Sequence, residues 1–348
     1  MAQKIATTVL SRSASPDMFQ AERNYVRLAA GGRLVNVDDL WSEEMWSHYP
    51  AWVRDDIEVN GSYYAVPQLG QQWGFYYRPS LLEEAGLTPP TTKDELVEAA
   101  QALTTDDVYG FAFGAGDNFT AYESFLSILY MMDGRLVHDG EPRVDTEEAR
   151  TALQFLHDLI YEYEVVPPSA PQLKESEVGD LFVGGQVAMM GQWDYHFARA
   201  TNPEQSNVVD DVAFTTPPSW DEATDGKAPG DFQILAINAY SENIGAAKLF
   251  LDYMRSQQAH ANELLLEGND TLVRDVYDMA AAETELEPGY LQAHSDLVDA
   301  SLRENYTQMA EVIDVFGGQI QSALAQAKTV EQALADAQSA IDEIMSSN

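Results

Sequence analysis

Hydrophobic residues along this chain follow two periods that alternate from one segment to the next. Residues 63–66, 73–77, 109–113, 208–214 and 232–238 are short runs rich in aromatic and β-branched side chains, which is typical of strands. We expect the Gly- and Gln-containing stretch between the first two runs to be a loop. Longer segments carry apolar residues at spacings of three and four, which predicts helices with one buried face. This alternation indicates an α/β protein.

Two capped helices are predicted directly after the strand at 73–77. Ser80 with Glu83, and Thr92 with Glu95, have the spacing of a capping box, in which each residue satisfies a free backbone N–H of the other. Gly86 is expected to end the first helix. The second helix should present one apolar face, formed by Leu96, Ala99, Ala100 and Leu103.

Further helices are predicted near 121–132, from Asp145, from Ser241 and at 330–345. Asp145 and Glu148 repeat the capping spacing. The helix after them has an apolar stripe of Ala149, Ala152, Leu153, Leu156, Leu159 and Ile160. The helix from Ser241 should turn four side chains inward, those of Ala247, Phe250, Leu251 and Met254. Residues 217–230, rich in Pro, Gly and acids, are the best linker candidate from composition.

The segment 63–103, with its strands, its helices and the run GLTPPTTKDEL, resembles a hallmark segment of the extracellular solute-binding proteins of ABC importers, in their sugar-binding branch. The resemblance continues, in family order, at 182–195 (FVGGQVAMMGQWDY), at 230–254 and in the closing helix. It implies a protein similar to maltose-binding protein, which binds a solute and catalyses no reaction.

The resemblance also implies a fold. The family has two α/β lobes of the type II periplasmic-binding-protein kind, with the ligand cleft between them and closure about the crossovers. By resemblance, residues 1–104 and 232–285 make the first lobe, and residues 105–231 and 286–348 make the second. In the family a signal or lipoprotein segment, a strand and a helix precede the segment that here reads ASPDM at 14–18. The resemblance therefore implies that the N-terminal strand and helix are missing from this chain.

Charge narrows the range of partners. The chain has 19 Lys and Arg against 57 Asp and Glu, a formal net charge of -38 that is spread along the sequence. Such a surface repels phosphate backbones and anionic lipid headgroups, so binding of nucleic acid or of a membrane surface is disfavoured. High ionic strength would screen the repulsion of the protein for itself, so we expect a halophilic source.

Several other classes of site lack their sequence signals. The chain has no cysteine for disulfides or thiolate metal sites, and its six histidines show no HExxH or similar spacing. Neither GxxxxGK[ST] nor GxGxxG occurs. We therefore expect no metal and no cofactor. The sequence shows neither a run of ~20 apolar residues that would span a membrane nor the apolar core of a signal peptide near its start.

A sugar site needs flat aromatic rings together with Asp, Asn, Gln or Arg. Trp193, with Asp194 beside it, matches the cleft tryptophan of the family, although a core tryptophan is the alternative interpretation. Asp17 matches the Asp of the "PD" segment that contacts ligand in relatives, and a helix cap is equally plausible for it. Asp231 and Phe232 follow a turn that enters the cleft in the family. Arg274 corresponds to a family Arg whose preceding Pro is here Leu272.

Four more candidates come from two other segments. Gln72 lies in the stretch between the first two predicted strands, and Trp73 begins the second of these strands. Asn118 and Tyr122 open the helix after the strand at 109–113. Each pair could line the cleft. For Trp73 a core position is an equal alternative. Glu123, next to Tyr122, is better interpreted as an acid in the first turn of its helix, where the helix dipole stabilises it.

Three hypotheses of function follow. The first is an extracellular, surface-associated and monomeric binding protein that captures a sugar or oligosaccharide and presents it to the transmembrane subunits of an ABC permease. The second is the same fold binding a polyamine or another small solute, since an acidic aromatic cleft would also suit a cation. The third is a secreted carbohydrate-active enzyme, which would need two carboxylates at catalytic separation.

Overall fold

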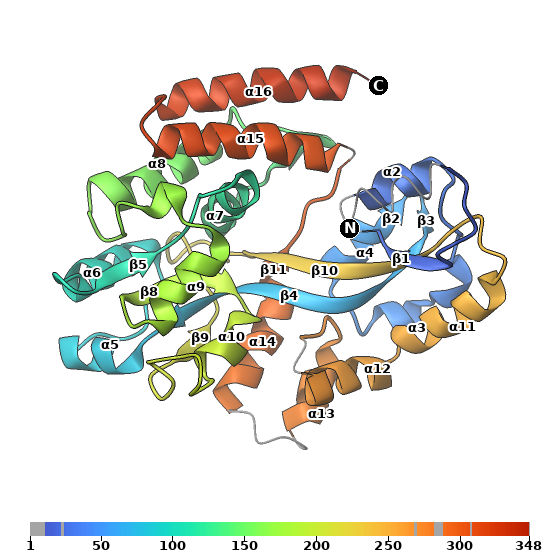
Figure 1. Ribbon diagram of the computed structural model, residues 1–348, viewed down its shortest axis with the longest axis horizontal. Coiled ribbons are helices and arrows are strands. Elements are labelled where there is room, and N and C mark those ends of the chain that lie inside the picture. The colour runs from blue at the N-terminus through green and yellow to red at the C-terminus, as the bar shows by residue number, and fades with distance from the viewer. Residues whose placement is uncertain (1–10, 22–23, 268–269, 282–287, 307, 348) are drawn as a thin grey trace. The chain divides into compact units, whose positions relative to one another are not determined.

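The computed structural model describes residues 11–21, 24–267, 270–281, 288–306 and 308–347 (Figure 1). The chain divides into two compact units. Unit 1 consists of Met1–Gln71, Gly230–Asp299 and Arg303–Ala310, and unit 2 consists of Gln72–Pro229, Ala300–Leu302 and Glu311–Asn348. Each unit is therefore built from three separated segments, and the long strands β4 (Ala65–Tyr77) and β10 (Ala228–Ile237) each contribute residues to both.

The first boundary differs from the expected position after residue 104. Residues 72–104 belong to unit 2, because helix α6 (Lys93–Leu103) packs against strand β5 (Tyr109–Ala112) of that unit. The approach is so close that a Cβ on Gly110 would lie 1.9 Å from the carbonyl oxygen of Ala100. The expected boundary at 285 also differs. The described residues 288–299 and most of 303–310 belong to unit 1, so that of the expected segment 286–348 only residues 300–302 and 311–348 belong to unit 2.

Unit 1 holds a mixed set of short helices and strands around one apolar core. Strand β1 (Met18–Gln20) pairs antiparallel with β10, with Phe19 opposite Ala236. The large side chains of Tyr25 and Phe232 are buried in the core. The remaining elements of unit 1 are α2 (Tyr25–Ala30), η2 (Asp38–Leu40), α3 (Glu43–Trp46), α4 (Ala51–Ile57), β2 (Glu58–Val59), β3 (Ser62–Tyr63), α11 (Ile244–Met254), α12 (Gln257–Asn262), η4 (Glu263–Glu267), α13 (Arg274–Ala281) and most of α14 (Pro288–Ala300).

Unit 2 is organised by a sheet with the order β9-β4-β8-β5. Strand β8 (Val187–Trp193) runs parallel to β5 and antiparallel to β4, and β9 (Ala213–Thr215) pairs antiparallel with β4. The other elements are α5 (Pro79–Ala85), α7 (Asn118–Met131), β6 (Val137–His138), β7 (Glu141–Pro142), α8 (Glu147–Tyr161), η3 (Ala170–Gln172), α9 (Glu175–Val183), α10 (His196–Ala200), β11 (Ser301–Leu302), most of α15 (Met309–Leu324) and α16 (Val330–Ser346).

Helices build outward from this sheet in layers. Helix α8 packs on α7, and α16 packs on α8, so that α15 and α16 form the outer layer at the red end of the chain (Figure 1). Within the residues that the structure describes, no helix combines the length and the apolar character needed to cross a membrane.

Several predicted elements are confirmed. Thr92 caps α6 by accepting a hydrogen bond from the backbone N–H of Glu95, and Gly86 ends α5 in the left-handed conformation with φ 71°. The six stripe residues of α8 are all buried. The closing helix α16 covers the predicted range.

Other details of the prediction are wrong. The expected loop between residues 66 and 73 is instead the middle of the continuous strand β4. Ser80 does not cap α5, because its hydroxyl and its backbone N–H both donate to the carboxylate of Asp211. Thr146, and not Asp145, caps α8. The strand expected at 208–214 is shorter and later, since β9 covers only Ala213–Thr215.

The helix expected from Ser241 begins at Ile244 instead. Three of its four expected inward residues are buried, namely Ala247, Leu251 and Met254. The fourth, Phe250, is 45% exposed and faces outward together with Leu249 and Tyr253. The helix therefore has a wider apolar surface than its core contacts use.

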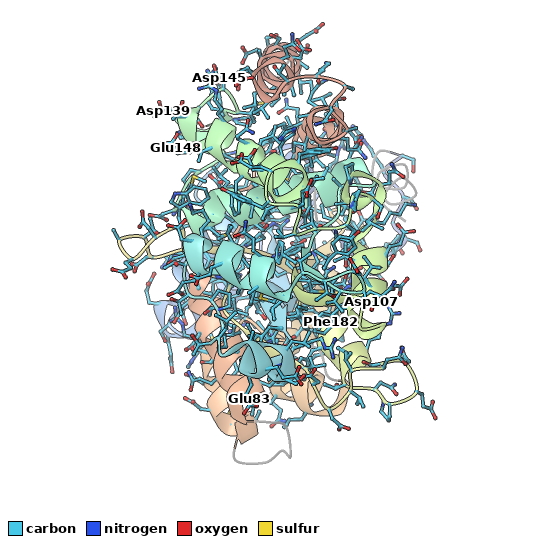
Figure 2. All side chains as sticks on the ribbon, turned by 90° about the vertical axis from the view of Figure 1, so that its left-hand side faces the viewer. Glu83, Asp107, Asp139, Asp145, Glu148 and Phe182 are labelled. Carbon is cyan, nitrogen blue, oxygen red and sulfur yellow. The ribbon has the colours of Figure 1, made fainter. Side chains whose placement is uncertain are left out.

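The surface of unit 2 carries many of the acidic residues. Figure 2 labels Phe182, which is fully buried, and five exposed carboxylates, those of Glu83, Asp107, Asp139, Asp145 and Glu148. These acids come from different helices and turns. The negative charge is thus distributed over the surface of this unit.

Candidate functional site

One edge of the unit 2 sheet gathers four of the predicted site residues. Because β5 and β8 are parallel, their carboxyl ends lie at the same edge, and β4 enters unit 2 there because it runs antiparallel to β8. The register places Trp73 opposite Trp193. Gln72 and Asp194 flank this pair. In α/β proteins, ligands bind outside the carboxyl ends of such strands.

Gln72 and Asp194 hold the two strands together at this edge. The backbone N–H of Gln72 donates to Asp194 Oδ2 at 2.6 Å, and the N–H of Asp194 donates to the Gln72 carbonyl at 3.0 Å. The hydroxyl of Tyr76 lies 2.9 Å from the carbonyl oxygens of both Trp193 and Asp194. The Asp194 carboxylate therefore fixes the backbone beside the two tryptophans.

Trp73 and Trp193 form an aromatic corner. Their ring centroids are 5.5 Å apart and their planes are nearly perpendicular, at 83°. This is the edge-to-face geometry that the quadrupoles of two rings favour. Gly191 makes room for it, since a Cβ there would lie 2.8 Å from Trp73 Nε1. Both indoles are buried, at 4% and 6% exposure.

A buried carboxylate supports this corner. Trp193 Nε1 donates to Glu123 Oε1 at 3.1 Å, and Glu123 is 4% exposed. The interpretation of Glu123 as a first-turn acid is wrong, because α7 begins at Asn118 and has no acid in its first turn. Sequence reasoning missed its contact with the indole, since no local spacing links positions 123 and 193.

Asn118 and Tyr122 also belong to unit 2, at the start of α7. Asp117 caps this helix by accepting from the N–H of Thr120. Asn118 lies against α15, where a Cβ on Gly317 would come within 2.1 Å of its carbonyl oxygen. Tyr122 is buried and makes an edge contact with Phe316 at 6.3 Å. The structure thus places both residues in the packing between α7 and α15.

The four candidates of unit 1 occupy three separate places. Asp17 lies in the first of these places. Its carboxylate accepts hydrogen bonds from Ser241 Oγ and from Asn243 Nδ2, and both residues come just before α11. Asp17 therefore anchors the start of that helix to the segment that leads into β1. Its side chain is partly exposed.

Asp231 and Phe232 meet at Arg303. The guanidinium Nη1 of Arg303 lies 2.7 Å from Asp231 Oδ1, and its Cζ lies 4.8 Å from the ring centroid of Phe232. Phe232 itself is 1% exposed and packs beside Trp52. A second carboxylate, that of Asp56, lies 3.7 Å from Arg303 Nε. Burial raises the pKa of Asp56 to about 6, although the charge of Arg303 opposes this shift.

Arg274 opens helix α13 and pairs with Asp299, with 2.7 Å between its Nε and the carboxylate Oδ1. Its side chain is 39% exposed. Exposed ion pairs of this kind contribute little to stability, because water screens them.

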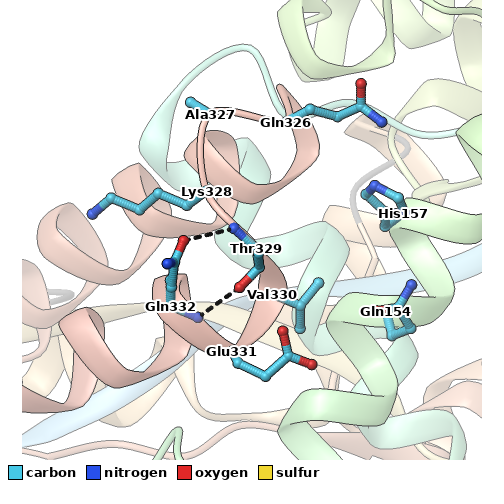
Figure 3. Close-up of a pocket in the computed structure, with 9 residues that line it drawn as sticks. All are labelled: Gln154, His157, Gln326, Ala327, Lys328, Thr329, Val330, Glu331 and Gln332. Atoms are coloured by element: carbon cyan, nitrogen blue, oxygen red, sulfur yellow. Dashed lines mark hydrogen bonds between the residues drawn. The ribbon is translucent and has the colours of Figure 1, made fainter.

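A pocket of about 450 Å³ lies elsewhere in unit 2, between α8 and the turn from α15 to α16 (Figure 3). Its walls carry Gln154 and His157 on one side and residues 326–332 on the other. Thr329 and Gln332 on the second side form a capping box (Figure 3). Lys328 Nζ contacts Gln319 and Asp336, which do not line the pocket. None of the predicted site residues lines it.

Residues 1–261, well over half of the 348, match the profile of the bacterial extracellular solute-binding proteins. The chain belongs to this family. Among its curated members, the mannitol-binding protein of Pseudomonas aeruginosa is 30% identical over 212 residues, which are 59% of this chain and 48% of that protein. A probable amino-acid ABC transporter periplasmic-binding protein of Sinorhizobium fredii is 23% identical over 292 residues, which are 82% of this chain and 65% of that protein.

This solute-binding protein shares its fold with a protein of known structure. Maltose-bound MalE3 of T. maritima superposes with a TM-score of 0.84 at 24% identity, covering 98% of this chain and 88% of that one. The expected two-lobed, maltose-binding-protein-like α/β fold is thereby confirmed. The chain spans 48% and 65% of the lengths of the two curated relatives.

Proposed function

We propose that this solute-binding protein captures a sugar or sugar alcohol outside the cell and delivers it, as a monomer, to the transmembrane subunits of an ABC importer. It catalyses no reaction on the solute. Family membership supports the transport role. The mannitol named for one relative and the maltose bound to one structural neighbour support the ligand class.

The observation that carries the ligand class is the aromatic corner of Trp73 and Trp193 at the sheet edge of unit 2. An indole offers a flat apolar surface to the C–H groups of a sugar ring. Buried amide and carboxylate groups stand beside it, those of Gln72, Asp194 and Glu123, and such groups orient a ligand by hydrogen bonds. We assign Trp193 the stacking role and Trp73 the role of fixing its orientation.

The other predicted residues complete the proposal. In unit 2, Asn118 and Tyr122 stand at the start of α7, the helix that also carries Glu123. In unit 1, Asp17, Asp231 and Arg274 keep part of their side chains exposed, and each remains by itself a candidate for hydrogen bonding to a solute. Phe232 supports Asp231 from the core.

A thermal-shift panel tests the proposal. A ligand that binds only the folded state raises the melting temperature, so a sugar or polyol from the panel should raise it and polyamines or amino acids should not. The panel holds mono- to tetrasaccharides, mannitol, ribitol, spermidine and the common amino acids, each at several concentrations in molar KCl. Absence of a shift with every sugar and polyol would refute the proposed ligand class.

The role of Trp193 is tested by Trp193→Phe, which keeps a buried ring but removes the larger indole and its N–H. We expect affinity for the sugar to fall by about 1 kcal/mol, roughly fivefold or more, because stacking area and the Glu123 contact are both lost. Trp220→Phe is the matched control, since Trp220 lies in the same unit and packs on Phe155. Equal losses in the two variants, measured by calorimetric titration, would remove Trp193 from the site.

A cationic solute is the second candidate, because the carboxylate of Glu123 lies at the edge of the Trp193 indole, where it accepts a hydrogen bond from Nε1. Aromatic rings next to a negative charge attract ammonium groups. In the same panel, this candidate predicts that spermidine raises the melting temperature and that neutral sugars leave it unchanged.

A further inference from the structure

Four asparagines begin an Asn-x-Ser/Thr triplet, which is the acceptor sequence for N-linked glycans: Asn60, Asn118, Asn269 and Asn305. Binding of a solute makes no use of these triplets. N-linked glycans are attached to exported chains, and this protein belongs to an extracellular family. A glycan is bulky and needs a surface position, so the fold decides which triplet is able to carry one. Asn269 lies outside the described residues, and the structure separates the other three.

Asn60 lies at the turn of a β-hairpin in unit 1 (Figure 1). Strand β2 pairs antiparallel with β3, with Val59 opposite Ser62, so Asn60 and Gly61 form the loop between them. Both loop residues have a positive φ, at 54° and 77°. This combination is typical of the type I′ turn, for which Asn-Gly is a favoured sequence. The local sequence therefore fixes the acceptor asparagine in the turn itself.

The turn has free space around it. Asn60 and Gly61 are both exposed, and a Cβ added to Gly61 would meet no atom within 4 Å. Among the described residues, none forms a hydrogen bond with the side-chain amide of Asn60. A glycan on Asn60 Nδ2 would therefore extend into solvent without displacing a contact of the fold.

The other two described acceptors are built into the fold. Asn118 lies in the first turn of α7, and its side-chain oxygen would be 3.7 Å from a Cβ on Gly318 of α15. The hydroxyl of its triplet, on Thr120, is 3.1 Å from Asp117 Oδ1, and Thr120 is buried. The amide nitrogen of Asn305 is buried. A glycan at either position would have to displace packed atoms, whereas none is in the way at Asn60.

We propose that Asn60 is a site of N-glycosylation, and that the donor is a lipid-linked oligosaccharide with a phosphate at its anomeric carbon. Asn60 Nδ2 forms a bond to this carbon, and the bond from the carbon to the phosphate oxygen breaks. The phosphate leaves with the electron pair, and the proton that Nδ2 loses passes to a base of the transferring enzyme. Nothing is oxidised or reduced in this step.

The contacts of Ser62 place the transfer before the hairpin has folded. Ser62 Oγ donates to Asp38 Oδ2 at 3.0 Å, and Asp38 Oδ1 accepts from the backbone N–H of Tyr63 at 2.6 Å. The hydroxyl is part of the acceptor signal, so the enzyme has to reach it while it is free of Asp38. Transfer therefore takes place on the newly exported chain, and the turn then holds the modified asparagine at the surface.

The test uses the full-length protein, produced with an affinity tag in the organism that encodes it and recovered from outside the cells. Trypsin cleaves after Lys and Arg, and it places the four acceptor asparagines in four different peptides. Mass spectrometry should find sugar on most copies of the peptide that contains Asn60. It should find none on the peptides that contain Asn118 and Asn305.

Four variants assign the modification to the triplet. Asn60→Asp removes the amide but keeps a residue that the turn accepts, and it should abolish the modification. Ser62→Ala should abolish it as well, whereas Ser62→Thr keeps a hydroxyl and should retain it. Asn118→Gln is the matched control and should leave the sugar on Asn60 unchanged. Thermal melting of each variant verifies that it is folded.

Three results would overturn the proposal. The first is an Asn60 without sugar in the unchanged protein, whether it remains asparagine or has become aspartate. The second is sugar on Asn118 or Asn305 in place of Asn60, because exposure would then not select the acceptor. The third is a modification that persists in Asn60→Asp or in Ser62→Ala, which would show a linkage outside this triplet. None of these results depends on which solute the protein binds, so they leave the proposed function to its own test.

Discussion

At the scale of single residues, the side chains of the candidate site also hold the fold together. Trp193 is buried and hydrogen-bonded to Glu123, and Asp194 pins the strand that carries Trp73. Replacing Trp193 by alanine would leave a cavity and cost roughly 3–5 kcal/mol of stability, which would obscure any effect on affinity. A substitution that keeps the ring is therefore the informative one.

Asp56 gives a residue-scale prediction about pH. Its folded pKa of about 6 lies above the ordinary value of 3.8, so its protonated form is stabilised by folding. The resulting stabilisation is present at low pH and is lost as the pH rises through 6, up to about 3 kcal/mol in all. Asp56→Asn removes the titration. Its free energy of unfolding, relative to the unchanged protein, should rise by about 1 to 2 kcal/mol between about pH 5 and pH 8.

The measurement is urea unfolding of both proteins at the two pH values. Asp55→Asn is the matched control, because Asp55 is the exposed neighbour of Asp56 in the same helix. A difference between Asp56→Asn and the unchanged protein that does not vary with pH would contradict the raised pKa.

At the scale of elements, contacts between residues close together in the sequence can be predicted from it, whereas contacts between residues far apart in the sequence cannot. The cap at Thr92 is predictable from the sequence because donor and acceptor lie three positions apart. Ser80 has the same local spacing, yet its hydroxyl bonds to Asp211, which is 131 positions away. The stretch after residue 66 contains Gly and Gln, as a loop would. It is part of a strand because β4 pairs with β10, which lies far along the chain.

The candidate site follows the same division. The resemblance to the family identifies Trp193 and its neighbours from the sequence, because they lie in one contiguous motif. For Trp73 the sequence leaves a core position open as an alternative, because its register opposite Trp193 comes from a pairing 120 positions apart that no periodicity reveals. The sequence shows for Glu123 only a place near the start of a helix, and the fold brings its carboxylate to the indole.

Contact between α6 and β5 gives an element-scale prediction. Gly110→Ala would put a Cβ 1.9 Å from the backbone carbonyl oxygen of Ala100, and a backbone cannot move aside as a flexible side chain can. We expect a loss of about 1–3 kcal/mol or more in the free energy of unfolding. Gly245→Ala is the control. It lies in the first turn of α11 with no atom within 4 Å of the new Cβ, and it should be neutral or stabilising by roughly 0.5–1 kcal/mol. Equal effects of the two changes on urea unfolding would contradict the close packing of α6 on β5.

At the scale of the whole molecule, the dominant feature is the net charge of -38. Charges of one sign on a compact surface repel, and the repulsion is relieved when the chain unfolds. Salt shortens the range of this repulsion, since the Debye length falls from about 30 Å at 0.01 M to about 3 Å at 1 M. The stability of this protein should therefore increase with ionic strength.

We expect the melting temperature to rise by several degrees between about 0.05 M and 2 M KCl, with most of the rise before the Debye length falls below the spacing of surface charges. The control is a variant in which the five exposed acids of Figure 2, Glu83, Asp107, Asp139, Asp145 and Glu148, become their amides, which changes the formal charge from -38 to -33. If self-repulsion is the cause, this variant should melt higher than the unchanged protein at low salt, and the difference should vanish at 2 M. A difference that persists at high salt would show that the amides act through local contacts. A melting temperature that stays constant or falls as KCl increases would show that the distributed acids do not destabilise the folded chain.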